Sequence, residues 1–173
     1  MKKIENELKE ILENISGNIL LIGNYSIKLE EIISKNENIL YCDQLIGNNN
    51  SNDNTKGKKS KKLNIKKIKK HYKKNKINNT IVKYEEIKDY KNTFVKDSTY
   101  ITKGNIIVID KNSDETIFNM YKRYTKDIKI INCLDGKIFV INSSKAKNNK
   151  IKDMYYFIHD LIIDIFDTIG NLL

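Results

Sequence analysis

Two positions at the ends of apolar runs are the best candidates for ligand chemistry in this sequence. Gly23 follows the run Ile19–Ile22, and Asp43 follows the run Ile39–Cys42. A glycine at such a turn lets the backbone bend sharply and approach a ligand closely. An acid at the end of the next strand can accept hydrogen bonds from sugar hydroxyls. This is the layout of a nucleotide-binding β-α-β unit, although most of the glycine fingerprint is missing.

The apolar pattern predicts the elements that position these two residues. Both runs are uniformly apolar, as expected for strands that are buried on both faces of a sheet. Ser26 can cap the intervening helix, and Leu29, Ile32 and Ile33 give that helix one apolar face. The segment therefore says more about the fold than about the reaction.

Three further acids follow predicted strands. Glu85 and Glu86 come after the short strand Thr80–Tyr84, at the sheet edge where open α/β folds bind ligands. They could act as general bases, but acids also suit the first turn of a helix. Asp110 ends the predicted strand Ile106–Ile109 and could face the same edge.

A run of lysines is the strongest candidate interaction surface. Lys56–Lys76 holds 12 of the 32 basic residues and no acid, so the rest of the chain has 20 basic and 22 acidic residues. Lysines that neutralise phosphates give salt-dependent binding with little sequence information, and a tyrosine ring can stack on a base. The candidate nucleic-acid contacts are Lys58, Lys59, Lys61, Lys62, Lys66, Lys67, Lys69, Lys70 and Tyr72.

Two other interpretations of the lysine run stay open. Arg123 is the only arginine, and Pro and Trp are absent, which is the bias that an A+T-rich genome imposes. The lysines could therefore belong to a solvated, codon-biased loop. Anionic lipid is another ligand for lysines, but Ile65 and Ile68 alone bury too little apolar area for firm anchoring.

Length and hydropathy favour a single cytoplasmic domain. The 173 residues can form one domain, residues 1–173, whose core needs no disulfide or metal. Met1–Ile15 has the pattern of an amphipathic helix with acids throughout, not that of a signal peptide. No apolar run approaches the roughly 20 residues that cross a bilayer.

The cysteines and histidines predict no metal site. Cys42 and Cys133 lie in predicted strands without motif spacing, so we expect two reduced thiols. His71 and His159 are too far apart in the sequence to suggest a metal pair.

Strands alternate with helices along the chain and end in a hairpin. This order predicts an α/β, doubly wound, mostly parallel Rossmann-like sheet with a C-terminal β-hairpin and a long C-terminal helix. The other expected elements are a helix over Lys3–Ile15, a mobile polar loop over 47–62, a lysine-rich helix over Asn64–Asn75, a helix marked by Ile87 to Val95, a helix opened by Ser113, a hairpin that turns at Leu134-Asp135-Gly136, and an appended helix over 148–173.

The last helix carries apolar residues every three to four positions over residues 148–173, with acids elsewhere on its surface. Such a stripe could cover a face of the sheet, or it could pair with a second copy of the chain as a homodimer contact.

The order of elements over Lys3–Ser144 resembles that of class I S-adenosylmethionine-dependent methyltransferases, whose mostly parallel sheet also carries a last antiparallel strand. A local similarity supports it, because Tyr100–Ile109 looks like the family's Leu-Lys-Pro-Gly-Gly turn running into its fifth strand. The Pro and the second Gly of that turn are absent here.

The resemblance implies where a cofactor would bind. Leu21-Ile22-Gly23-Asn24-Tyr25 matches the first-strand loop that contacts S-adenosylmethionine, so that Gly23, Asn24 and Tyr25 would touch the cofactor. Asp43 matches the acid that accepts hydrogen bonds from the ribose hydroxyls. In the family this loop is richer in glycine.

Because the chain departs from the family pattern, two predictions of its function stay open. Val82-Lys83-Tyr84-Glu85 stands in place of the Asn/Asp-Pro-Pro-Tyr catalytic signature, so no catalytic residue can be assigned. One prediction is an S-adenosylmethionine-dependent methyltransferase-like protein of unknown substrate, as a trimmed or inactive member. The alternative is a non-catalytic nucleic-acid-binding module that uses segment 56–76.

Overall fold

The structure is a computed structural model that describes residues 1–45, 68–112, 115–146, 154–155, 158–159 and 162. The predicted polar loop 47–62 and nearly all of the predicted helix 148–173 lie outside these residues. No helix in the described ranges is long and apolar enough to span a membrane. Within the described residues, Cys42 and Cys133 are thiols that are not joined in a disulfide.

The described chain alternates helices with strands. Its α-helices are α1 (Ile4–Asn14), α2 (Ile27–Lys35), α3 (Ile68–His71), α4 (Lys91–Ile101) and α5 (Thr116–Lys122). Its strands are β1 (Asn18–Ile22), β2 (Tyr41–Leu45), β3 (Asn79–Lys83), β4 (Asn105–Asp110), β5 (Ile128–Cys133) and β6 (Gly136–Asn142). Short 3-10 turns cover Tyr84–Glu86, Lys88–Tyr90 and Ser143–Lys145.

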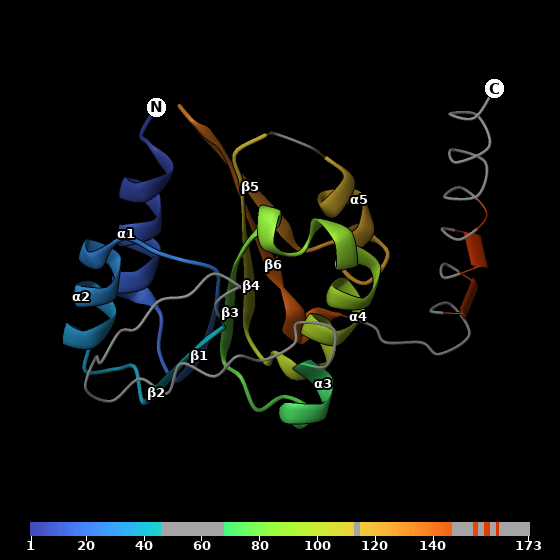
Figure 1. Ribbon diagram of the computed structural model, residues 1–173, viewed down its shortest axis with the longest axis horizontal. Helices are drawn as coiled ribbons and strands as arrows, with labels where there is room; N and C mark the ends of the chain where they lie inside the picture. The colour runs from blue at the N-terminus through green and yellow to red at the C-terminus, as the bar shows by residue number, and fades with distance from the viewer. Residues whose placement is uncertain (46–67, 113–114, 147–153, 156–157, 160–161, 163–173) are drawn as a thin grey trace.

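The strands form one mixed sheet in the order β2-β1-β3-β4-β6-β5. β2, β1, β3 and β4 pair in parallel, and β6 runs antiparallel to both of its neighbours (Figure 1). From β1 the chain moves to β2 on one side and then returns past β1 to β3 on the other. The strand order therefore reverses between β1 and β3, and a crevice for ligands is expected outside their carboxyl ends.

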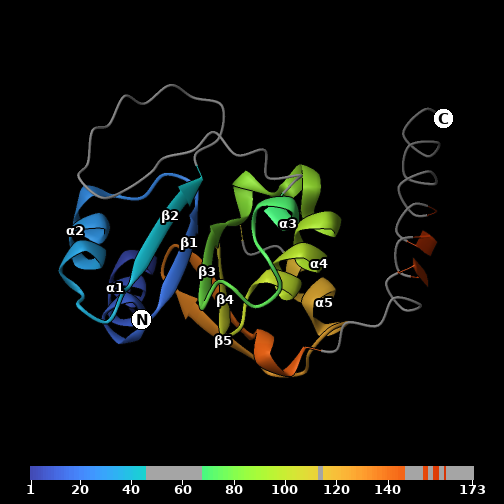
Figure 2. The same cartoon turned by 90° about the horizontal axis from the view of Figure 1, so that it is seen from below.

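Helices cover both faces of the sheet, because the central strands are apolar on both sides. On β1, Ile19 and Leu21 face the cluster under α1 and α2, whereas Leu20 and Ile22 face the cluster under α3, α4 and α5. Figures 1 and 2 show these two helical layers on opposite sides of the strands. Polar groups can act only where such strands end, since their middle residues are fully enclosed.

The α/β class and the mostly parallel sheet are confirmed. α1 and β4 agree closely with their predicted ranges, and the antiparallel pair β5–β6 lies where the Asp-Gly turn predicts it. Gly136 stands at that turn with φ 139°, a backbone conformation that favours glycine.

Three local predictions are wrong. Asp43 does not end the second strand: β2 continues to Leu45, and Asp43 pairs with Leu20 in the middle of the strand. The lysine-rich helix does not reach Asn75, because α3 ends at His71 and Asn75 adopts φ 54° to turn the chain toward β3. Ser26 precedes α2 without capping it, since its hydroxyl instead donates to Glu5 Oε1 at 3.1 Å.

The two-sided core makes a testable distinction between two isoleucines. Ile107 in β4 is fully buried, whereas Ile130 in β5 is 39% exposed. Ile107→Ala should lower the free energy of unfolding by about 3 kcal/mol, because it removes buried methyl groups and leaves a cavity. Ile130→Ala is the matched control and should cost less than about 1 kcal/mol. Urea denaturation followed by circular dichroism measures both, and equal losses would contradict this account of the core.

Candidate functional site

Gly23 lies immediately beyond β1, at the point where the strand order reverses. It is buried and has φ 110°, in the region that favours glycine. A Cβ atom added there would lie 3.1 Å from Glu86 Cγ and 3.3 Å from Lys83 Cδ. A side chain at this position would crowd Glu86 and Lys83, and the positive φ would strain it, so two charged side chains lie close to a position that favours glycine.

Lys83 and Glu86 come from the carboxyl end of β3, the strand beside β1. Lys83 is the last residue of β3, and Glu86 closes the 3-10 turn after it. The Lys83 ammonium donates a hydrogen bond to the carbonyl oxygen of Asn24 and lies 5.0 Å from the centre of the Tyr25 ring. A cation above the face of an aromatic ring is attracted by the ring quadrupole. Lys83 thus links the end of β3 to the loop after β1.

The loop residues predicted to contact a cofactor have different surroundings. Asn24 is exposed, while Tyr25 is half-buried and packs against the core under α1 and α2. The Tyr25 hydroxyl donates to the carbonyl oxygen of Ile22 at 3.1 Å. Burial raises the pKa of Tyr25 well above its ordinary value, and the negative charge of Glu86 raises it further. Tyr25 is therefore a neutral, anchored ring that supports the loop.

The Lys83 ammonium is held in a partly dehydrated position. Burial lowers the pKa of Lys83 below its ordinary value, the positive charge of Lys111 lowers it further, and Glu86 acts in the opposite direction. Lys83 therefore lies within electrostatic reach of Lys111, which follows β4, and of Glu86, which follows β3.

Other acids predicted near this edge are placed differently. Asp43 lies two residues before the end of β2, opposite Leu20. Asp110 is fully buried at the end of β4, and its Oδ1 accepts a hydrogen bond from the backbone N–H of Asn112 at 2.9 Å. Glu85 is exposed and accepts from the Asn112 side-chain amide at 2.6 Å. Glu85 and Asp110 are therefore joined through Asn112 rather than directed at Gly23.

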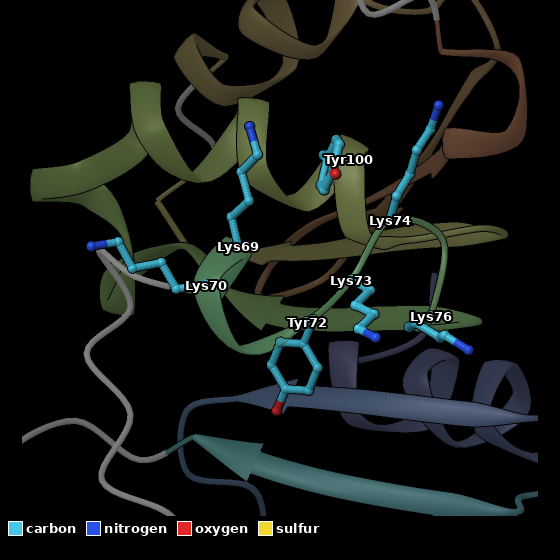
Figure 3. Close-up of a pocket in the computed structure, with 7 residues that line it drawn as sticks. All are labelled: Lys69, Lys70, Tyr72, Lys73, Lys74, Lys76 and Tyr100. Carbon is cyan, nitrogen blue, oxygen red and sulfur yellow. The ribbon is translucent and has the colours of Figure 1, made fainter.

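The described part of the lysine run forms an open cleft of about 520 Å³. α3 supplies two of its lining residues, the loop after α3 supplies four, and α4 supplies one (Figure 3). The lining residues are Lys69, Lys70, Tyr72, Lys73, Lys74, Lys76 and Tyr100. The structure thus brings Lys69, Lys70 and Tyr72 together, while the predicted contacts Lys58, Lys59, Lys61, Lys62, Lys66 and Lys67 lie outside the described residues.

Sequence reasoning missed Lys83 and Tyr100. It also did not name Lys73, Lys74 and Lys76 as contacts, although they lie in the predicted segment 56–76. The signal for Lys83 is its place at the end of a strand beside β1, which becomes visible only when the strand order is known. Over the described ranges, no group of three or more His, Cys, Asp or Glu side chains could hold a metal ion.

Comparison with solved structures identifies the fold. A protein described as a type 11 methyltransferase from Sulfolobus solfataricus superimposes with a TM-score of 0.57 at 14% identity, over 86% of this chain and 95% of that one. TrmK of M. capricolum, in complex with S-adenosyl-homocysteine, superimposes with a TM-score of 0.50 at 12% identity, over 86% and 73% of the two chains. No protein-family model and no curated protein sequence matches the chain.

The chain resembles the class I methyltransferases in fold. This resemblance does not fix the reaction. Spermidine synthase from Thermotoga maritima superimposes with a TM-score of 0.54 at 9% identity, over 83% of this chain and 58% of that one. The proposed function therefore rests on the residues around Gly23 and not on the fold alone.

The pKa of Lys83 should shift in opposite directions in two variants. Lys111→Gln removes a neighbouring positive charge, so it should raise the pKa of Lys83. Glu86→Gln removes the stabilising negative charge, so it should lower that pKa further. The Nζ resonance of Lys83, followed by NMR over alkaline pH, measures both shifts.

The lowered pKa of Lys83 also predicts how the stability of the fold depends on pH. Because the pKa of Lys83 is lower in the folded than in the unfolded chain, the folded state binds fewer protons there, and this residue's contribution to stability increases as pH rises toward the ordinary lysine range. Shifts of the Lys83 pKa in the same direction in Lys111→Gln and Glu86→Gln would contradict the arrangement.

Proposed function

We propose that the chain is a single Rossmann-like domain, residues 1–173, that binds S-adenosylmethionine at Gly23 as a methyltransferase-like protein. The observation that carries the proposal is the closeness of the Lys83 and Glu86 side chains to the glycine at the reversal of the strand order. Neighbours of the same fold include a complex with S-adenosyl-homocysteine, which supports the choice of cofactor.

The residues present fit the amino-acid part of the cofactor. That part carries one ammonium and one carboxylate, and Glu86 and Lys83 supply the complementary charges beside a backbone without a side chain. Charge-assisted hydrogen bonds are the strong ones in such a site. Lys83 would bind the carboxylate, Glu86 would bind the ammonium, and Asp43 remains the proposed partner of the ribose hydroxyls. When bound, S-adenosylmethionine supplies a methyl group activated by its sulfonium.

The residues that follow β3 support the proposal that the chain is a trimmed or inactive methyltransferase-like protein. Tyr84 stands within the segment that replaces the catalytic signature, and its side chain is buried in the core under α3, α4 and α5. Glu85 is bonded to Asn112. We therefore assign binding and orientation to Lys83 and Glu86, and no catalytic residue.

Calorimetric titration with S-adenosylmethionine and S-adenosyl-homocysteine tests this function. Binding of both ligands is expected, and Glu86→Gln should weaken it by about 1.5–3 kcal/mol because the acceptor for the ligand ammonium loses its negative charge. Glu85→Gln is the matched control, since it alters a neighbouring acid that points to Asn112. Asp43→Ala should weaken binding by a similar amount if the ribose lies at β2.

Absence of heat at millimolar ligand would remove the proposed function. Equal effects of Glu85→Gln and Glu86→Gln would show that the weakening is a general effect of charge. An unchanged affinity in Asp43→Ala would show that the ribose does not contact this residue.

A non-catalytic nucleic-acid-binding module is the second candidate function. The gathering of Lys69, Lys70, Lys73 and Lys74 in one cleft favours it. Lysine is a point charge without the bidentate geometry of arginine, so its contacts would be mainly with phosphates. Affinity should then differ little between unrelated sequences.

Salt dependence tests this second function. Neutralising Lys66, Lys67, Lys69 and Lys70 together should make the plot of log affinity against log salt shallower by roughly one unit for each phosphate that no longer has a lysine partner. Anisotropy titrations at several salt concentrations measure the slope. Strong binding that does not weaken as the salt concentration rises would contradict binding through phosphates, because counterions compete with lysine–phosphate contacts.

The proposal includes a cytoplasmic location and a homodimer contact through the C-terminal helix. Met154, Tyr155, Ile158 and Ile162 in that segment are 64%, 64%, 47% and 47% exposed. Pairing of two copies would cover such side chains, since Met154, Ile158 and Ile162 recur at a spacing of four residues along one side of a helix.

A further inference from the structure

The lysines of the cleft are carried by backbone that is fixed to α4. The backbone N–H of Lys69 donates to the carboxylate of Asp97, a buried side chain of α4. Farther along, the N–H of Asn75 donates to the carbonyl oxygen of Tyr100 at 3.1 Å, and the N–H of Ile77 donates to that of Ile101 at 3.1 Å. The cleft is therefore built on a helix and has a defined shape before any ligand binds.

The ammonium groups diverge rather than converge. Figure 3 shows Lys69 directed toward α4, Lys70 directed away from the cleft on one side, and Lys73 and Lys76 directed to the other side. Separated charges of this kind suit a chain of separated phosphates better than a single phosphate group. A lone anion would need several donors aimed at one point.

Two aromatic rings lie among these charges. Tyr72 and Tyr100 are half-buried, with part of each ring against the core under α3 and α4. The Lys69 ammonium lies 4.5 Å from the centre of the Tyr100 ring. Unstacked bases pair readily with aromatic faces, whereas the bases of a duplex are already stacked on one another.

We propose that this cleft binds single-stranded nucleic acid, with its lysines on successive phosphates and a base stacked on Tyr72. This inference rests on the nucleic-acid-binding function proposed above and names the form of nucleic acid that the cleft takes. Among the described residues, the cleft is lined by lysine and tyrosine alone, so its lining offers no aliphatic side chain to enter a lipid layer.

The cleft is separate from the Gly23 site. Lys76 lies just before the amino end of β3, whereas Lys83 beside Gly23 lies at its carboxyl end. Seven residues of extended chain span about 20 Å. A strand held in the cleft and a cofactor at Gly23 should therefore bind without competing.

Fluorescence anisotropy with a labelled single strand of about 12 nucleotides, compared with its duplex, tests the cleft in the absence of cofactor. The full chain should bind the single strand roughly tenfold more tightly than the duplex. Tyr72→Leu should weaken single-strand binding by about that factor, whereas Tyr72→Phe, which keeps the ring, should stay close to the original affinity. If Tyr72→Leu does not fold, as judged by circular dichroism, Tyr100→Leu takes its place.

Charge controls separate the cleft from the net charge of the chain. Replacing Lys73 and Lys74 by Gln should weaken binding of both single strand and duplex. Replacing Lys28 and Lys35 by Gln changes the net charge equally on exposed positions of α2, across the sheet, and should have little effect. In every one of these variants the affinity for S-adenosylmethionine should be unchanged, which keeps failure of the cleft distinct from failure of the Gly23 site.

Three results would overturn the inference. The first is an absence of oligonucleotide binding at low salt. The second is equal affinity for single strand and duplex with no effect of Tyr72→Leu, which would indicate a phosphate-binding surface without stacking. The third is binding to phosphatidylserine vesicles in place of oligonucleotides, which would identify a lipid surface.

Discussion

Burial of the central strands on both faces is the constraint on which the rest of this structure depends. Ile19–Ile22 and Ile106–Ile109 are enclosed between two helical layers. A strand buried in this way can hold no functional polar group along its middle, because an unpaired polar group there would lose its hydration. Chemistry at the central strands is therefore confined to their ends, and the reversal of strand order between β1 and β3 selects which of these ends meet.

Gly23 combines backbone freedom with crowding. Its positive φ lets the chain leave β1 sharply, and the Lys83 and Glu86 side chains would crowd a Cβ atom at this position. Lys83 also holds the following loop through the Asn24 carbonyl and the Tyr25 ring. A single glycine and one lysine thus shape the loop that follows β1.

The sequence predicts those parts of the fold that depend on local patterns. Uniform apolar runs identify β1 and β4, and the Asp-Gly pair identifies the β5–β6 turn. The end of β2 could not be predicted, because it is set by pairing with β1, where Ile22 lies opposite Leu45. The end of α3 likewise depends on a distant partner, since Asn75 bonds to Tyr100. Gly23 follows β1 and Glu86 lies in the turn after β3, so only the strand order reveals that these two residues are neighbours.

An NMR titration with S-adenosyl-homocysteine tests the central claim most directly, because it locates a ligand rather than only detecting one. The account predicts that the backbone amides of Gly23, Asn24 and Glu86 shift together and saturate together. The amide resonances of Lys73 and Lys74 in the cleft should not shift. Shifts confined to the cleft, or an absence of shifts at Gly23 with saturating ligand, would contradict a cofactor site at the junction of β1 and β3.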